Sequence, residues 1–133
     1  NSQSTAFRAE LAPLLLMWPG VGRFDDIFAS YLARAYMDAN DWFHAAGSPA
    51  VRQDRNPHNL IRDVENELFG WKHLREVTDI LRTAGPTTTG QTPLEGFAIL
   101  AHAVIDNFGE LPAQTEDDLN AWMDDLDDAG VAE

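Results

Sequence analysis

Apolar residues recur along most of the chain three and four positions apart, which is the spacing of one face of an α-helix. No segment alternates apolar and polar residues between turn residues, so the sequence predicts no β-strand. Glycine, proline and short polar stretches separate five helical segments, expected at residues 5–17, 25–46, 57–84, 93–108 and 115–128. The pattern predicts an all-α fold, a single compact bundle of about five helices joined by short loops.

Helix-start residues support two of these boundaries. Asn56 followed by Pro57 is typical of an N-cap and a first helical position, and Thr92 followed by Pro93 repeats the arrangement. Glu95 lies three residues after Thr92 and completes a capping box. We therefore expect the third helix to begin at Pro57 and the fourth to begin at Pro93.

Proline, aspartate and glycine residues indicate where the first three helices begin, end or bend. Pro13 lies inside the first, so either a kink or a restart of the helix is expected there. Asp25 or Asp26 is the expected cap of the second helix, and Gly47 its end. Gly70 lies in the middle of the third helix, costs about 1 kcal/mol relative to alanine and is a candidate position for a bend.

The second and third helices carry long apolar stripes that we expect to face the core. The stripe of the third helix consists of Leu60, Ile61, Val64, Leu68, Trp71, Leu74, Val77 and Leu81. The stripe of the second helix consists of Ile27, Phe28, Tyr31, Leu32, Ala35, Ala39, Trp42, Phe43 and Ala46. The second stripe is broad, and self-association as a homodimer is one possible use of apolar surface that the core leaves over.

The last helix combines apolar and acidic residues, and Thr115 is its expected cap. Residues 115–133 hold six aspartates, two glutamates and no basic residue. The apolar stripe consists of Leu119, Trp122, Met123 and Leu126. Aspartates near the C-terminal end of a helix each disfavour it by roughly 0.3–1 kcal/mol. We therefore expect a helix only if the stripe packs on the bundle or on a partner. The expected organisation is one domain, 1–133, with 110–133 an acidic C-terminal helix docked on it.

The charge of the chain limits its partners. It has 22 acidic and 9 basic residues and a net charge of −13, and residues 110–133 hold nine of the acidic residues and none of the basic ones. Nucleic acid and anionic membrane surfaces are disfavoured, because both need clustered lysine and arginine. The chain has no cysteine, which excludes disulfides and thiolate metal sites. Without a signal segment or a long apolar run, a cytoplasmic location is expected, with secretion after signal removal as the alternative.

These features predict an acidic protein-binding module that acts as an inhibitor, an immunity-like protein or an adaptor toward a basic protein surface. The expected contact residues are an anchor, Trp122, and four charges that steer association, Asp118, Asp124, Asp125 and Asp128. The sequence predicts no catalytic residue and no cofactor, and a binding role is preferred to an enzymatic one.

Two alternatives remain from other classes. One is a structural assembly subunit. The other is an enzyme or sensor with a metal or small ligand between the third and fourth helices, with the candidate ligands His73, Glu76, Glu95, His102 and Asp106. The Glu-x-x-His order of carboxylate-bridged bundles occurs nowhere in the chain. The preferred interpretation is a surface ion pair between His73 and Glu76 and a histidine at the edge of the core at position 102.

Overall fold

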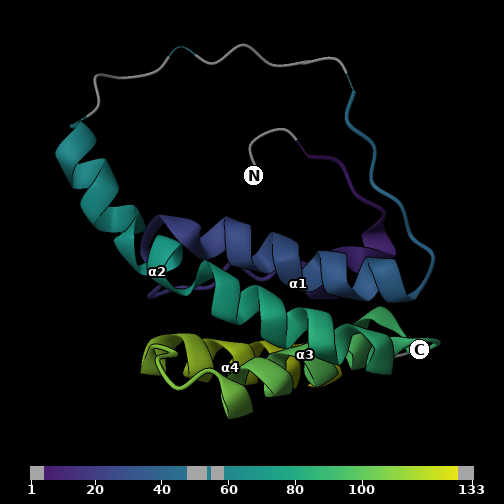
Figure 1. Cartoon of the computed structure of the whole chain (residues 1–133). Helices are drawn as coiled ribbons and strands as arrows, with labels where there is room; N and C mark the ends of the chain where they lie inside the picture. Colours follow the sequence, from purple (N-terminus) through teal and green to yellow (C-terminus); the bar gives the residue numbers. More distant parts are fainter. Residues whose placement is uncertain (1–4, 48–53, 55–58, 129–133) are drawn as a thin grey trace.

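A computed structural model describes residues 5–47, 54 and 59–128 of the chain. In these residues the secondary structure is entirely helical, and the predicted all-α fold is confirmed. The α-helices are α1 (Asp25–Ala39), α2 (Leu60–Ala84), α3 (Pro93–Asn107) and α4 (Ala113–Asp128). Short 3-10 helices are η1 (Ala9–Leu15), η2 (Gly22–Phe24) and η3 (Gly85–Thr88). Figure 1 shows α1 and α2 crossing the molecule on one side of α3 and α4.

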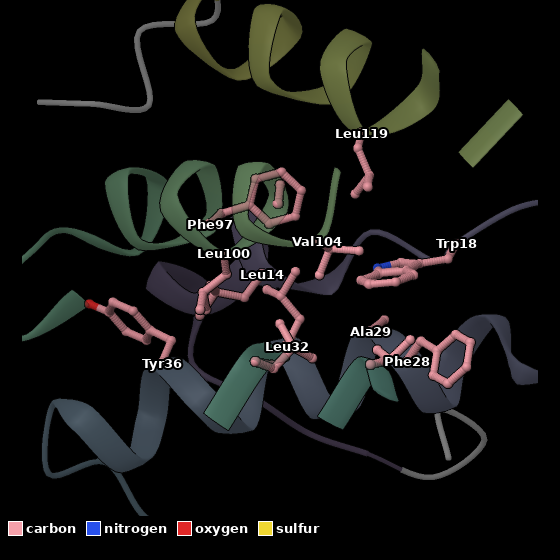
Figure 2. Packing of buried hydrophobic residues seen from close by; sticks show 14 of the residues in the cluster. Leu14, Trp18, Phe28, Ala29, Leu32, Tyr36, Phe97, Leu100, Val104 and Leu119 are labelled. Atoms are coloured by element: carbon pink, nitrogen blue, oxygen red, sulfur yellow. The ribbon is translucent and has the colours of Figure 1, made fainter. Parts of the chain in front are cut away.

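One hydrophobic core joins these elements. Its largest fully buried side chains are Trp18, Phe28 and Phe97, which come from the turn after η1, from α1 and from α3. Leu119 of α4 belongs to the same cluster. Figure 2 shows α3 between α1 and α4, with side chains filling the space on both sides of it. None of the helices in the described residues has the length and apolar character needed to cross a bilayer.

The first predicted helix is shorter and of a different type than expected. Only Ala9–Leu15 is helical in the described part of this segment, and it forms a 3-10 helix with Pro13 inside it. Proline lacks the backbone N–H that a regular α-helix needs at an interior position, which disfavours a longer α-helix here. The segment still buries Leu11, Pro13 and Leu14.

The second helix ends seven residues earlier than predicted. The prediction placed its end at Ala46, whereas α1 ends at Ala39. The Asn40 side chain donates to the carbonyl of Tyr36 (3.0 Å) and to that of Thr88 (3.1 Å), and it accepts from the N–H of Gly90 (2.8 Å). Asn40 therefore ties the end of α1 to the segment after η3. Asp41 follows with a φ of 57°, which turns the chain away from the helix.

The predicted start of α3 is confirmed, whereas the predicted start of α2 is wrong. The Thr92 hydroxyl accepts from the N–H of Glu95 (3.3 Å), and the Glu95 carboxylate accepts from the N–H of Thr92 (2.8 Å). Helix α2 begins at Leu60 because the Asn59 side chain accepts two N–H groups of the first turn at 3.2 Å. The residues predicted as cap and first position, Asn56 and Pro57, lie outside the described residues.

Two other predicted caps do not act as caps. Helix α1 begins at Asp25, after Phe24, and no side chain caps it. The Asp25 carboxylate instead accepts from the N–H of the next residue, Asp26, at 2.8 Å. Helix α4 begins at Ala113, two residues before Thr115. Thr115 therefore lies within the helix, and its side chain is fully buried in the protein.

Gly70 allows close packing between α2 and the η2 segment. A Cβ at this position would lie 1.9 Å from the nearest ring carbon of Phe24, which no side chain could tolerate without a shift. Phe24 is itself in ring contact with Phe28 (5.6 Å) and with Trp71 (5.4 Å). The glycine therefore determines which side of α2 faces the bundle.

Candidate functional site

Helix α4 is held on its own bundle by its apolar stripe and by two long-range hydrogen bonds. Leu119 is fully buried. The indole N–H of Trp122 donates to the carbonyl of Pro13 at 3.0 Å, and the Thr115 hydroxyl donates to the carbonyl of Pro19. The stripe thus packs against the N-terminal segment and α3 of its own chain.

A depression of about 290 Å³ lies where α4 meets the N-terminal segment. It joins residues from the end of η1, from the first turn of α1 and from α4. We call it the acidic depression, and its lining consists of Leu16, Met17, Pro19, Asp25, Asp118, Ala121, Trp122 and Asp125. Five of these residues are apolar and the other three carry carboxylates.

The carboxylates of the acidic depression are arranged around an apolar wall, which consists of Leu16, Met17, Pro19, Ala121 and Trp122. Asp118 and Asp125 lie seven residues apart, two helical turns, and therefore share one face of α4. Asp25 begins α1 on the opposite side. Trp122 is partly buried between Asp118 and Asp125 along that face, while Met17 is 46% exposed at the rim.

No cation in the described residues compensates these carboxylates. Neither lysine nor arginine lines the acidic depression in that part of the chain. The ion pairs of the described residues involve acidic groups outside the depression, such as Asp38 with Arg34 and Glu67 with Arg23. Three negative charges beside a low-dielectric wall create a local potential that attracts a cation.

This geometry suits a lysine or arginine side chain supplied by another molecule. The aliphatic stem of such a side chain can cover the apolar wall while its charged end stays near the carboxylates and water. An arginine can also stack its guanidinium on the ring of Trp122.

The depression contains three of the five predicted contact residues. Trp122, Asp118 and Asp125 line it, whereas Asp124 and Asp128 are exposed on other parts of α4. No pattern in the sequence connects Asp25 with Asp118 and Asp125 of α4, because they are more than ninety positions apart. The only signal at Asp25 was its expected role as a helix cap.

The alternative metal site receives no support from the geometry. Among the described residues, no three His, Asp or Glu side chains lie close enough together to hold a metal ion. All five candidate ligands are described. Glu95 instead belongs to the capping box of α3, and the pKa of its carboxyl is lowered because the backbone N–H and the hydroxyl of Thr92 donate to it.

The predicted pairing of His73 with Glu76 is present, but the burial of both histidines is the reverse of the prediction. His73 is buried, in ring contact with Phe69 (4.7 Å) and Phe108 (5.2 Å), and its Nδ1 lies 3.5 Å from a carboxylate oxygen of Glu76. His102, expected at the edge of the core, is exposed, and its Nδ1 lies 2.8 Å from a backbone carbonyl of its own helix. Periodicity did not distinguish the inner from the outer face of either helix.

A second hollow, of about 390 Å³, lies between α1, the end of α2 and η3. Its charged residues are already paired, since Arg34 binds Asp38 at 2.6 Å and Arg82 binds Asp79 at 3.2 Å. It therefore lacks the uncompensated charge that distinguishes the acidic depression.

Comparison with models of protein families found no match, and searches of curated proteins and of solved structures found no similar protein.

Proposed function

We propose that this protein is an acidic binding module for a basic protein surface, acting as an inhibitor, an immunity-like protein or an adaptor. The observation that carries the proposal is the acidic depression, in which Asp25, Asp118 and Asp125 surround an apolar wall with no described cation. A lysine or arginine of the partner occupies it, with the stem against Trp122 and the charge near the carboxylates.

The remaining charge has a kinetic role. Asp124 and Asp128 are exposed on α4 outside the lining of the depression, and the chain as a whole has a net charge of −13. Such a field accelerates association with a basic partner and weakens as salt is added. Exposed ion pairs are worth at most about 1 kcal/mol each, so charge alone gives little selectivity. Selectivity comes from combining the charges with the apolar wall.

A pull-down with matched variants tests this function. The immobilised protein should capture partners that are basic, and the yield should fall between low and high salt. The double substitution D118N/D125N removes two charges that line the depression, and D117N/D127N removes two exposed charges of α4 that do not line it. We expect the first variant to lose capture and the second to retain most of it.

Two results would contradict the proposal. One is capture that does not depend on salt. The other is equal loss of capture in both variants, which would indicate a general charge effect without a defined site.

A further inference from the structure

The N-terminal half of α2 presents an apolar face to solvent. Its five large side chains are each between 61% and 75% exposed. We call this face the outer stripe, and it consists of Leu60, Ile61, Val64, Leu68 and Trp71. The sequence predicted that these residues face the core, and that expectation is wrong. Figure 1 shows the first turns of α2 extending beyond the ends of the other helices.

The outer stripe lies on the opposite side of α2 from its buried residues, although the ring of Trp71 also contacts Phe24 of the bundle (5.4 Å). The buried residues of α2 are Gly70, His73, Val77 and Leu81, which follow one another at helical spacing on the other side of the helix. On the outer side, the apolar residues stop at Trp71. The same side then continues with Arg75, Asp79 and Arg82, which are exposed. On this outer side, apolar residues thus occur only in the N-terminal half of α2, from Leu60 to Trp71.

The spacing of the outer stripe matches a helix-pairing seam. Ile61, Val64, Leu68 and Trp71 are separated by three, four and three positions, the a and d positions of successive heptads. Five side chains of this size present on the order of 600 Å² of apolar surface, at the upper end of what monomers leave in one patch. Complete burial of this surface in two copies would remove about 1,200 Å² in total, the lower limit of specific interfaces.

We propose that the outer stripe is a homodimer interface, in which two copies of α2 pair antiparallel about a twofold axis. In this arrangement Ile61 of one chain faces Trp71 of the other, and Val64 faces Leu68. Every layer then combines a smaller with a larger side chain, which fills the seam evenly. Parallel pairing would instead place Val64 against Val64 and Trp71 against Trp71.

The helix dipoles favour the same orientation. Antiparallel pairing aligns the dipoles of the two α2 helices favourably, whereas parallel pairing places their equal ends side by side.

Burying the outer stripe would leave no donor of Trp71 unsatisfied. Its indole N–H already donates to Glu67 of the same helix at 3.3 Å. Glu67 and Asp63, on one border of the stripe, are both paired with Arg23. The polar groups on this border of the stripe are therefore satisfied within one chain, which lowers the cost of pairing.

Sedimentation equilibrium of the full chain tests the dimer, between about 1 and about 300 µM protein. The mass should rise from the 14.8 kDa of one chain toward twice that value as concentration increases. Leu68→Glu should remain at 14.8 kDa throughout, and circular dichroism should show unchanged helix content. Phe43→Glu is the matched control, because Phe43 is 89% exposed and lies outside the stripe. It should associate like the wild type.

A wild-type protein that stays monomeric over the whole range would overturn the proposal, even if the stripe were found to bind a different protein. A dimer that persists in Leu68→Glu would overturn it as well. Salt separates this inference from the proposed function, because two chains of charge −13 repel. Added salt should therefore strengthen the dimer and weaken capture of a basic partner.

Cross-linking tests the orientation, and the absence of natural cysteine makes it simple. When Val64→Cys and Leu68→Cys chains are mixed and oxidised, antiparallel pairing predicts that the mixed disulfide exceeds both self-linked forms. A parallel pair would give mainly self-linked forms, and that result would contradict the antiparallel arrangement.

Discussion

The acidic helix α4 and the projecting half of α2 carry similar apolar stripes, yet the stripe of α4 packs inward and the outer stripe faces solvent. Leu119 of α4 is fully buried, whereas Leu68 of α2 is 61% exposed. Spacing indicates which residues share a helix face, but it does not show which way that face points. The buried residues of α2 run from Gly70 through His73 and Val77 to Leu81, and at Gly70 the missing side chain admits the ring of Phe24.

Truncating one leucine in each stripe should produce the largest contrast. Leu119→Ala should lower the free energy of unfolding by about 2–5 kcal/mol, because it leaves a cavity in the core. Leu68→Ala, the same change at an exposed position, should alter it by no more than about 0.5 kcal/mol. Urea denaturation followed by tryptophan fluorescence at about 1 µM, where the proposed dimer is dissociated, measures both. Equal losses would show that the two stripes do not differ as described.

Replacing Gly70 by alanine tests whether the close contact with Phe24 sets the orientation of α2. Gly70→Ala should destabilise by about 1–3 kcal/mol, since the new Cβ collides with Phe24 and outweighs the gain in helix propensity. Gly109→Ala is the control, because a Cβ there would meet nothing within 4 Å. The same denaturation experiment applies, and a stabilised Gly70→Ala protein would refute the close contact.

The two tryptophans in these stripes, Trp122 and Trp71, should differ in how much their indole N–H groups contribute to stability. Trp122→Phe removes the donor to the carbonyl of Pro13 and should cost about 1 kcal/mol. Trp71→Phe removes a donor to the exposed carboxylate of Glu67 and should be close to neutral in the monomer. Thermal denaturation followed by circular dichroism at low concentration compares them. A neutral Trp122→Phe would show that α4 does not depend on this bond.

The smallest effect is expected at the start of α3, the helix that contacts both α2 and α4. Bonding to Thr92 lowers the pKa of Glu95 below its ordinary value of 4.5. A lowered folded-state pKa means that the contribution to stability is complete above the unfolded-state value and is lost as pH falls through the folded-state value. The stability difference between wild type and Glu95→Gln should therefore be constant from about pH 7 to about pH 6 and shrink below about pH 4. A difference that grows on acidification would contradict this.

Local chemistry was predictable wherever the deciding residues are neighbours in sequence. The capping box at Thr92 and Glu95 and the apolar stripe of α4 depend on positions three or four apart. The end of α1 was not predictable, because Asn40 stops the helix through bonds to Thr88 and Gly90, about fifty positions away.

Long-range packing also determined what sequence reasoning missed in the candidate site. Trp122, Asp118 and Asp125 were identified from α4 alone. Asp25 and Met17 join them only because the N-terminal segment crosses α4. The spacing of apolar residues within each helix does not reveal that crossing. The outward face of α2 was missed for the same reason, since the contact that decides it is between Gly70 and Phe24.

Titrating the isotope-labelled protein with a hexalysine peptide, followed by amide and indole NMR signals, tests the acidic depression most directly. We predict shifts that cluster at Met17, Asp25, Ala121, Asp125 and the indole of Trp122, that are lost in D118N/D125N and that persist in D117N/D127N. Shifts spread evenly along the exposed aspartates of α4, with both double variants weakened alike, would contradict a defined site for a basic side chain.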